Sequence, residues 1–99
     1  MIHADSQTYG SVLIVSDTGN NRIVIVSEQS YECVTTIGAG TRGDEDGSFD
    51  EAKLYHPQGL VLTQYQGEEA ILSCDAKNHK IKVAKLKSRV VKTVAGTGV

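Results

Sequence analysis

Residues 13–26 read LIVSDTGNNRIVIV and residues 71–84 read ILSCDAKNHKIKVA, so one pattern occurs twice at a constant shift of 58 positions. Apolar runs, an aspartate, an asparagine, a basic residue and an isoleucine coincide in the two copies. Farther on, residues 36–38 (TIG) match residues 93–95 (TVA) at a shift of 57, which indicates that one residue was lost between the copies. Similarity at a fixed period is typical of a repeat architecture, so duplication explains the pattern better than chance.

Each copy predicts short β-strands. The apolar run before the aspartate is typical of a strand that is buried on both faces. After the turn, residues 80–83 alternate polar and apolar side chains, as a half-buried strand does. Residues 1–10 do not resemble the first strand of the second copy, so the first copy is expected to lack that strand. The expected strands are residues 12–16, 22–26 and 33–37 in the first copy, and 59–63, 70–74, 80–85 and 90–94 in the second.

The turn inside each copy begins at an aspartate and contains glycine or asparagine. A short carboxylate there accepts hydrogen bonds from backbone amides about two residues ahead. Glycine and asparagine tolerate the positive φ that such a reversal needs. The repeat-turn residues expected to matter for the structure are Asp17, Gly19, Asn20, Arg22, Asp75, Asn78 and Lys80.

The segment between the copies differs in kind. Residues 40–47 are polar and rich in glycine, which is typical of a surface loop. Residues 48–51 (SFDE) fit the S-x-x-E capping box and predict a short helix through about Leu54. Proline cannot continue that helix, because it lacks an amide hydrogen and disfavours helical geometry at the preceding residue. The residues of this segment and the next strand that are expected to be structural are Gly47, Ser48, Phe49, Glu51, Pro57 and Gly59.

These elements predict an all-β fold. Repeated sets of four antiparallel strands with hairpin links are the plan of a β-propeller blade. We expect one unit over residues 1–99, a partial propeller of about two four-stranded blades with one short capped helix between them. The expected boundaries are blade one at about 11–41, lacking its first strand, loop and helix at 41–56, and blade two at 57–98. A blade buries its faces against its neighbours, so two blades leave two faces open.

The repeat turns resemble the NHL repeat, which is named after an Asn-His-Leu stretch at this turn. Asn78 and His79 match that stretch, and Lys80 stands at the leucine position. The resemblance covers residues 12–98 and implies part of a six-bladed ring. The segment between the copies is similar to NHL propellers that follow a thioredoxin-like domain, through TIG at 36–38, DGSF at 46–49 and PQGL at 57–60. This chain has no Cys-x-x-Cys motif, so no redox role is carried over.

The net charge of −2 conceals an asymmetry along the chain. Residues 1–62 carry nine acidic and three basic side chains, whereas residues 63–99 carry three acidic and seven basic ones. Basic side chains can neutralise nucleic-acid phosphates. Here the lysines lie largely along a strand, as they do on exposed and edge strands, and no aromatic residues interleave with them to stack bases. Nucleic acid is therefore a disfavoured partner, and RNA binding, which the resemblance allows, is the alternative function.

Candidate sites for chemistry fail on spacing. Residues 42–53 partly fit an EF-hand calcium loop, but Arg42 and Lys53 occupy its first and last ligand positions, which need carboxylates. The histidines are isolated from one another, at His3, His56 and His79. A metal-dependent lyase, known among NHL-like propellers, would need histidines converging on a channel, so a remnant of one is the second alternative. We expect no catalytic residues, no metal and no cofactor.

The two cysteines lie far apart, without zinc-site spacing. Cys33 and Cys74 are expected to be small buried apolar residues, and their spacing leaves a disulfide open. Residues 1–10 lack the basic and apolar regions of a signal peptide, which favours a cytoplasmic setting. No apolar run approaches the roughly 20 residues that cross a bilayer, so no membrane association is expected.

The function expected from these observations is that of a non-enzymatic NHL-repeat segment acting as a protein-interaction scaffold. Loops at one face of a rigid propeller are suited to bind a protein partner. The open faces would be covered by further blades, either by self-association or from a longer parent chain. Three copies of two blades would complete a six-bladed ring.

Overall fold

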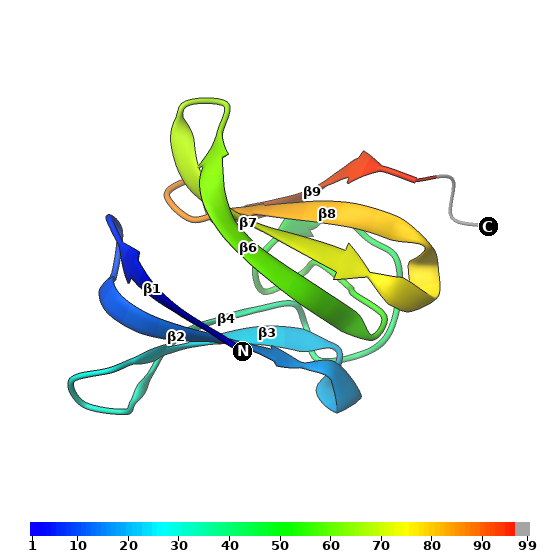
Figure 1. Cartoon of the computed structure of the whole chain (residues 1–99). Helices are drawn as coiled ribbons and strands as arrows, with labels where there is room; N and C mark the ends of the chain where they lie inside the picture. The colour runs from blue at the N-terminus through cyan, green and yellow to red at the C-terminus, as the bar shows by residue number, and fades with distance from the viewer. Residues whose placement is uncertain (97–99) are drawn as a thin grey trace.

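The chain folds into two antiparallel β-sheets, which the computed structural model describes over residues 1–96 (Figure 1). Blade one has the strand order β1-β2-β3-β4, formed by β1 (Ile2–Ser6), β2 (Gly10–Asp17), β3 (Arg22–Ser27) and β4 (Cys33–Ile37). Blade two has the order β5-β9-β8-β7-β6, formed by β5 (Gly47–Ser48), β6 (Pro57–Tyr65), β7 (Glu68–Asp75), β8 (Lys80–Lys85) and β9 (Val90–Ala95). The expected all-β fold of a partial propeller is confirmed.

Helical structure is confined to two single turns of 3₁₀ helix in the described part of the chain. These are η1 (Thr18–Asn20) and η2 (Ala76–Asn78), one at the turn of each repeat. Within residues 1–96, no helix is long and apolar enough to span a membrane.

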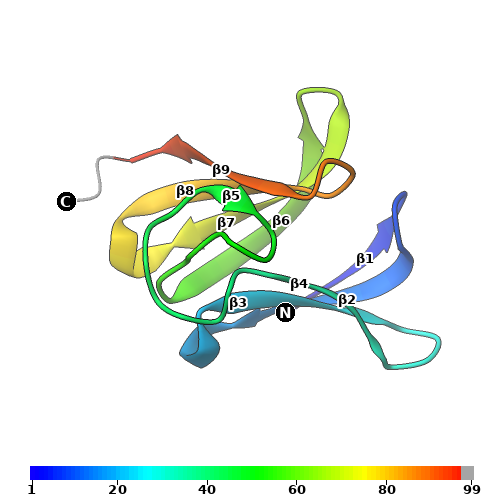
Figure 2. The ribbon, with the colours of Figure 1, turned by 180° about the vertical axis from the view of Figure 1, so that it is seen from behind.

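The core lies between the two sheets and is shared by them. Burying one such aliphatic side chain contributes roughly 1.5–3 kcal/mol. Blade one supplies Val12, Ile14, Ile23, Ile25 and Ile37, blade two supplies Ile71, Ala84, Leu86 and Val91, and the connecting segment supplies Phe49, Ala52 and Leu54. The connecting segment comprises residues 38–56; Figure 2 shows it running from β4 to β5, which pairs with β9, and from there to β6.

Blade one has the first strand that the sequence was expected to lack. β1 pairs with β2 in the register Ile2↔Ile14 and Ala4↔Val12. Ile2 and Ala4 pack against the core, whereas His3 and Asp5, which alternate with them, are exposed. The prediction was wrong because it looked in residues 1–10 for a sequence like that of β6. A short edge strand such as β1 needs only side chains that alternate between the core and solvent. Blade one therefore begins at about residue 2.

The capped helix predicted between the blades is also absent. Residues 49–51 form one turn, in which the Ala52 amide donates to the Ser48 carbonyl at 2.8 Å, and the chain then extends. Ala52 and Leu54 are buried at a spacing of two, and Lys53 between them forms a β-bridge with Glu45. Nucleating a helix is costly, and too few residues remain before the proline for propagation to offset that cost.

The two repeats have the same length, because each contains one β-bulge at a different place. In blade one the bulge omits Val34 from the β3–β4 pairing, and in blade two it omits Val94 from the β8–β9 pairing. Residues of β4 that lie between the two bulge positions correspond to residues of β9 at a shift of 57. Beyond the bulges the shift is 58 again, as at Ile37 and Ala95, which pair with Ile23 and Ile81. The inference that a residue was lost is therefore wrong.

Candidate functional site

The two repeat turns have the same backbone geometry. The left-handed residue is Asn21 in blade one (φ 56°, ψ 43°) and His79 in blade two (φ 56°, ψ 42°). The positive φ thus falls one residue later than predicted, after Asn20 and Asn78, and Gly19 does not need it. The chain first makes a 3₁₀ turn, and the residue that follows this turn adopts the positive φ.

The turn aspartates accept hydrogen bonds, but not from the nearby backbone amides that were predicted. Asp17 accepts from the Asn20 side-chain amide at 3.1 Å and from Arg22 Nε at 2.9 Å. The hydrogen bond from Arg22, together with that from Asn20, lowers the pKa of Asp17. Asp75 is fully buried and accepts from the Asn78 side chain at 2.6 Å.

The second turn also holds the connecting segment in place. Asp75 accepts a hydrogen bond from the Tyr55 backbone amide at 2.7 Å, across 20 residues of sequence. The Asn78 side chain donates to the Gly43 carbonyl at 2.7 Å. In the first turn, the Asn21 side chain accepts from the His56 amide at 3.0 Å. The repeat turns therefore position the loop and the start of β6.

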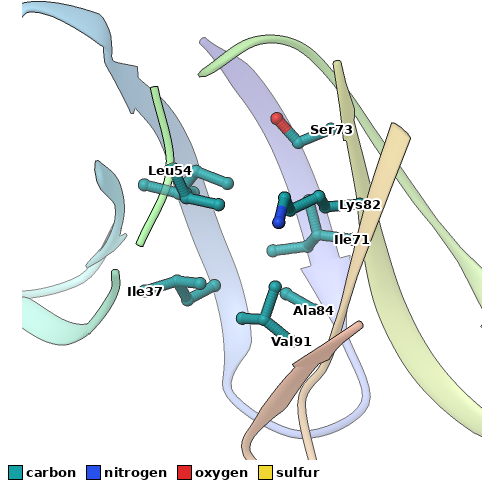
Figure 3. A pocket seen from close by; sticks show the side chains of 8 residues that line it. Ile37, Leu54, Ile71, Ser73, Lys82, Ala84 and Val91 are labelled. Carbon is teal, nitrogen blue, oxygen red and sulfur yellow. The ribbon is translucent and has the colours of Figure 1, made fainter. Parts of the chain in front are cut away.

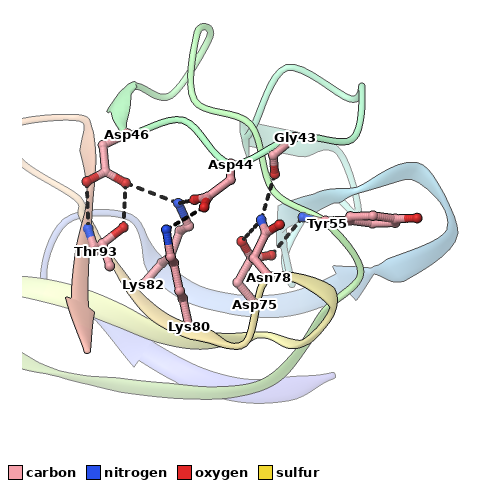
Figure 4. A network of polar contacts seen from close by, with 9 residues as sticks. All are labelled: Gly43, Asp44, Asp46, Tyr55, Asp75, Asn78, Lys80, Lys82 and Thr93. Carbon is pink, nitrogen blue, oxygen red and sulfur yellow. Dashed lines mark hydrogen bonds and ion pairs between the residues drawn. The ribbon is translucent and has the colours of Figure 1, made fainter. Parts of the chain in front are cut away.

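The acidic loop is joined to blade two by a network of five residues, here called the loop–blade network (Figure 4). Lys82 Nζ lies 2.8 Å from Asp44 and 3.1 Å from Asp46. Lys80 Nζ also contacts Asp44, instead of the turn aspartate that its counterpart Arg22 binds. Asp46 additionally accepts hydrogen bonds from the amide and hydroxyl of Thr93, at 2.9 and 2.8 Å. Two carboxylates of the segment that partly fits a calcium loop, Asp44 and Asp46, are thus paired with lysines.

Lys82 is the unexpected member of this network. Its side chain is 2% exposed and lies among core residues, although the alternation in β8 had suggested an outward lysine. Burial opposes its charged form, but the hydrogen bonds that Lys82 donates to the two aspartates outweigh burial and raise the pKa of Lys82. Hydrogen bonds from Lys80 and Lys82 lower the pKa of Asp44. Burial opposes ionisation of Asp46, yet its bonds with Thr93 and Lys82 prevail and lower its pKa.

A second cluster joins the β1–β2 turn to blade two through Glu69, which is 7% exposed. Its carboxylate accepts hydrogen bonds from the Ser6 hydroxyl at 2.6 Å, the Gln7 amide at 2.8 Å and the Thr8 amide at 3.1 Å. Burial opposes ionisation, but these hydrogen bonds lower the pKa of Glu69. Sequence reasoning missed this cluster, since no local pattern links residues about 60 positions apart.

The connecting residues singled out from the sequence serve the packing of the segment. The Ser48 hydroxyl donates to Glu51 at 3.0 Å, so this pair forms a side-chain contact instead of capping a helix. Phe49 is 1% exposed, and the Arg89 guanidinium lies 4.9 Å from its ring centroid. Pro57 begins β6, where its carbonyl accepts from Thr18. Gly47 lies in β5, and Gly59 has a φ of 51° at the bulge in β6.

The cavity that the described residues enclose between the blades is small. Figure 3 shows the gap between the sheets, lined by apolar side chains, by Ser73 and by Lys82. Its volume is about 10 Å³, and a buried water needs about that much space. Among the described residues, no three His, Cys, Asp or Glu side chains are grouped to hold a metal ion.

In the described part of the chain, no element covers the side of blade two that faces away from the core. The accessible residues of this outer face of blade two are Val61, Leu72, Cys74 and Ile81. Val61 is 56% exposed, and a shallow apolar depression lies between it and Ile81. Cys74 is exposed, as is Cys33 in blade one, and both thiols are free. The prediction of buried cysteines is therefore wrong, because successive strand residues alternate sides and no described element covers the outer side of either sheet.

The sequence is similar to a small group of curated proteins, although no family model matches it. NHL repeat-containing protein 2 of Gallus gallus is 36% identical over 90 residues, which are 91% of this chain and 12% of that protein. The Homo sapiens protein of the same name is 32% identical over 82 residues, 82% of this chain and 11% of that protein. Protein SUPPRESSOR OF QUENCHING 1, chloroplastic, of Arabidopsis thaliana is 32% identical over 92 residues, 92% of this chain and 8% of that protein. The chain thus spans about a tenth of the length of these relatives.

Proposed function

Because the chain is related over most of its length to NHL repeat-containing protein 2 and folds as two blades of a partial propeller, we propose that it is a protein-binding scaffold segment and not an enzyme. The proposal rests chiefly on the outer face of blade two. Exposed apolar patches rimmed by polar residues mark interaction surfaces on soluble proteins. A sheet face is also well suited to this role, because its strands hold the side chains in fixed positions.

The contacts of the lysines favour a protein partner over RNA. Lys80 and Lys82 are paired with Asp44 and Asp46, and Lys85 Nζ lies 3.8 Å from Glu68. An ammonium group that is already paired with a carboxylate releases few counterions on meeting a phosphate, so it contributes little to nucleic-acid affinity. The two free, exposed thiols are compatible with a reducing, cytoplasmic setting.

Photo-crosslinking from a single cysteine would test the proposal. In Cys33→Ser, a thiol-reactive photo-crosslinker is attached to Cys74 on the outer face of blade two. In the control, both cysteines are serine and Gln29→Cys carries the same label at the exposed β3–β4 turn. Each labelled chain is irradiated in an extract of cells that produce it, with excess unlabelled chain as competitor.

We expect one defined protein to be captured from Cys74, identifiable by mass spectrometry, and not from residue 29. Unlabelled chain should compete for capture, whereas adding Val61→Glu to the chain labelled at Cys74 should reduce capture at least about tenfold, because it places a charge on the same face. Nuclease-sensitive adducts would instead support RNA binding. Equal capture from both labels, or none from Cys74, would contradict a protein-binding role for this face.

A further inference from the structure

The outer face of blade two repeats a surface that is buried in blade one. At the shift of 58 residues, Ile14 and Ile23 correspond to Leu72 and Ile81. The two isoleucines lie in the core between the blades and are 0 and 2% exposed. Their counterparts are half-buried on the far side of blade two. The outer face of blade two thus carries apolar residues at the positions that blade one uses to pack against blade two.

The far side of blade one repeats the surface that blade two buries. Ile71 and Ala84 lie in the shared core, and their counterparts at the same shift are Leu13 and Val26. This outer face of blade one consists of half-buried apolar residues on its two central strands, namely Leu13, Val15, Val24 and Val26. The chain therefore carries both halves of its own inter-blade contact, one at each end.

We propose that a second copy of this chain docks the outer face of its blade one onto the outer face of blade two, head to tail. This inference rests on the proposed protein-binding role of that face and names its partner. The contact would repeat between molecules the packing that exists within each molecule. Because it joins two different surfaces, it leaves a free end on each side, and successive copies either close into a ring or continue as a chain.

One substitution between the repeats makes the contact feasible without a second acidic loop. Lys82 faces blade one, and its ammonium needs Asp44 and Asp46 of the connecting loop. The corresponding residue of blade one is Val24, which needs no polar partner. A buried charge without a partner opposes association, whereas a valine at this position favours it.

The charges of the two ends also complement each other. Residues 1–39 carry four acidic side chains and one basic, and residues 57–96 carry three acidic and seven basic. With Lys80 and Lys82 paired to the loop aspartates, blade two still has five basic side chains against three acidic ones. Opposite net charge favours contact between unlike ends over contact between like ends.

The test uses two variants that each block one face. Val61→Glu places an acidic group on the outer face of blade two, and Val24→Lys places a basic group on that of blade one. A lysine at residue 24 is compatible with the sheet, because Lys82 occupies the same place in blade two. Light scattering on a sizing column gives the mass of each protein at rising concentration, and circular dichroism confirms that each variant is folded. Tyr31→Ser, at an exposed turn, is the control.

We expect the unmodified chain and the Tyr31→Ser control to form oligomers, and each face variant alone to remain near the 10.6 kDa of one chain. An equal mixture of the two variants should form dimers and nothing larger, because each supplies the face that the other lacks. An unmodified chain that stays monomeric, or a mixture that does not dimerise, would overturn the proposal. If the Cys74 crosslinker then captures a different protein, the scaffold function stands while self-association fails.

Discussion

A glycine at the end of the fourth strand of each repeat lets the backbone pass beside the repeat turn. Gly38 and Gly96 have φ values of 106° and 108°, and each faces the carbonyl of the left-handed turn residue, Asn21 or His79. A Cβ at Gly96 would contact the His79 carbonyl oxygen and lie 2.8 Å from Lys80 Cα. Both atoms belong to the backbone, so they cannot move aside as a flexible side chain can.

The Gly96→Ala variant should therefore be strongly destabilised. We expect the free energy of unfolding in urea to fall by more than about 2 kcal/mol, from the unfavourable φ and the backbone contact together. Gly67→Ala is the matched control, because Gly67 also has a positive φ, of 83°, but a Cβ added there would have no neighbouring atom within 4 Å. That control should lose only about 1 kcal/mol. Equal losses in the two variants would show that the close approach contributes nothing.

Among the elements, the β1–β2 hairpin depends on a side chain of blade two. Glu69 accepts its three hydrogen bonds from Ser6, Gln7 and Thr8 in the turn of this hairpin. The hairpin adds the edge strand β1 to blade one, and an edge strand has backbone pairing on one side only. Its order therefore depends on Glu69 as well as on the pairing with β2.

Glu69→Ala should increase amide hydrogen exchange at Gln7 and Thr8 about tenfold or more, because both amides lose their acceptor. Protection in β8, at the centre of blade two, should change little. Glu68→Ala is the control, since the Glu68 carboxylate accepts hydrogen bonds from Ser88 in the β8–β9 turn and none from the β1–β2 hairpin. Unchanged exchange at Gln7 and Thr8 in the Glu69 variant would show that the carboxylate does not hold the hairpin.

At the scale of the whole molecule, acidic side chains join segments that are distant in sequence. Asp44 and Asp46 connect the loop to blade two, and Glu69 connects blade two to blade one. The pKa of each of these carboxyls is lowered in the folded chain. A lowered folded-state pKa means that protonation favours the unfolded chain.

Stability should accordingly be constant from pH 7 to about pH 5 and fall as the pH decreases through the unfolded-state values of about 4. The measurement is the free energy of unfolding in urea at each pH. Asp46→Asn should show a shallower decline, because one of the three carboxyls no longer titrates. A stability that rises as the pH falls below 5, or an unchanged slope in the variant, would contradict the assignment.

Much of the fold was predictable from local patterns. The 58-residue shift, the strand positions and the turn aspartates follow from residues close together in sequence, because strand alternation and turn chemistry act over a few positions. The capped helix failed for the opposite reason. Residues 48–51 satisfy a local rule, but burial of Ala52 and Leu54 against both sheets favours an extended chain.

The amino-acid sequence by itself determined the repeat, its strands and its similarity to NHL repeat-containing protein 2. Only the tertiary structure decided that β1 completes blade one, that Lys82 points inward to Asp44 and Asp46, and that Glu69 holds the first hairpin. The contacts of Lys82 and Glu69 join residues from 36 to 63 positions apart. Which residues become partners depends on which faces the two sheets bury when they pack together. A local stretch of the chain does not contain that information.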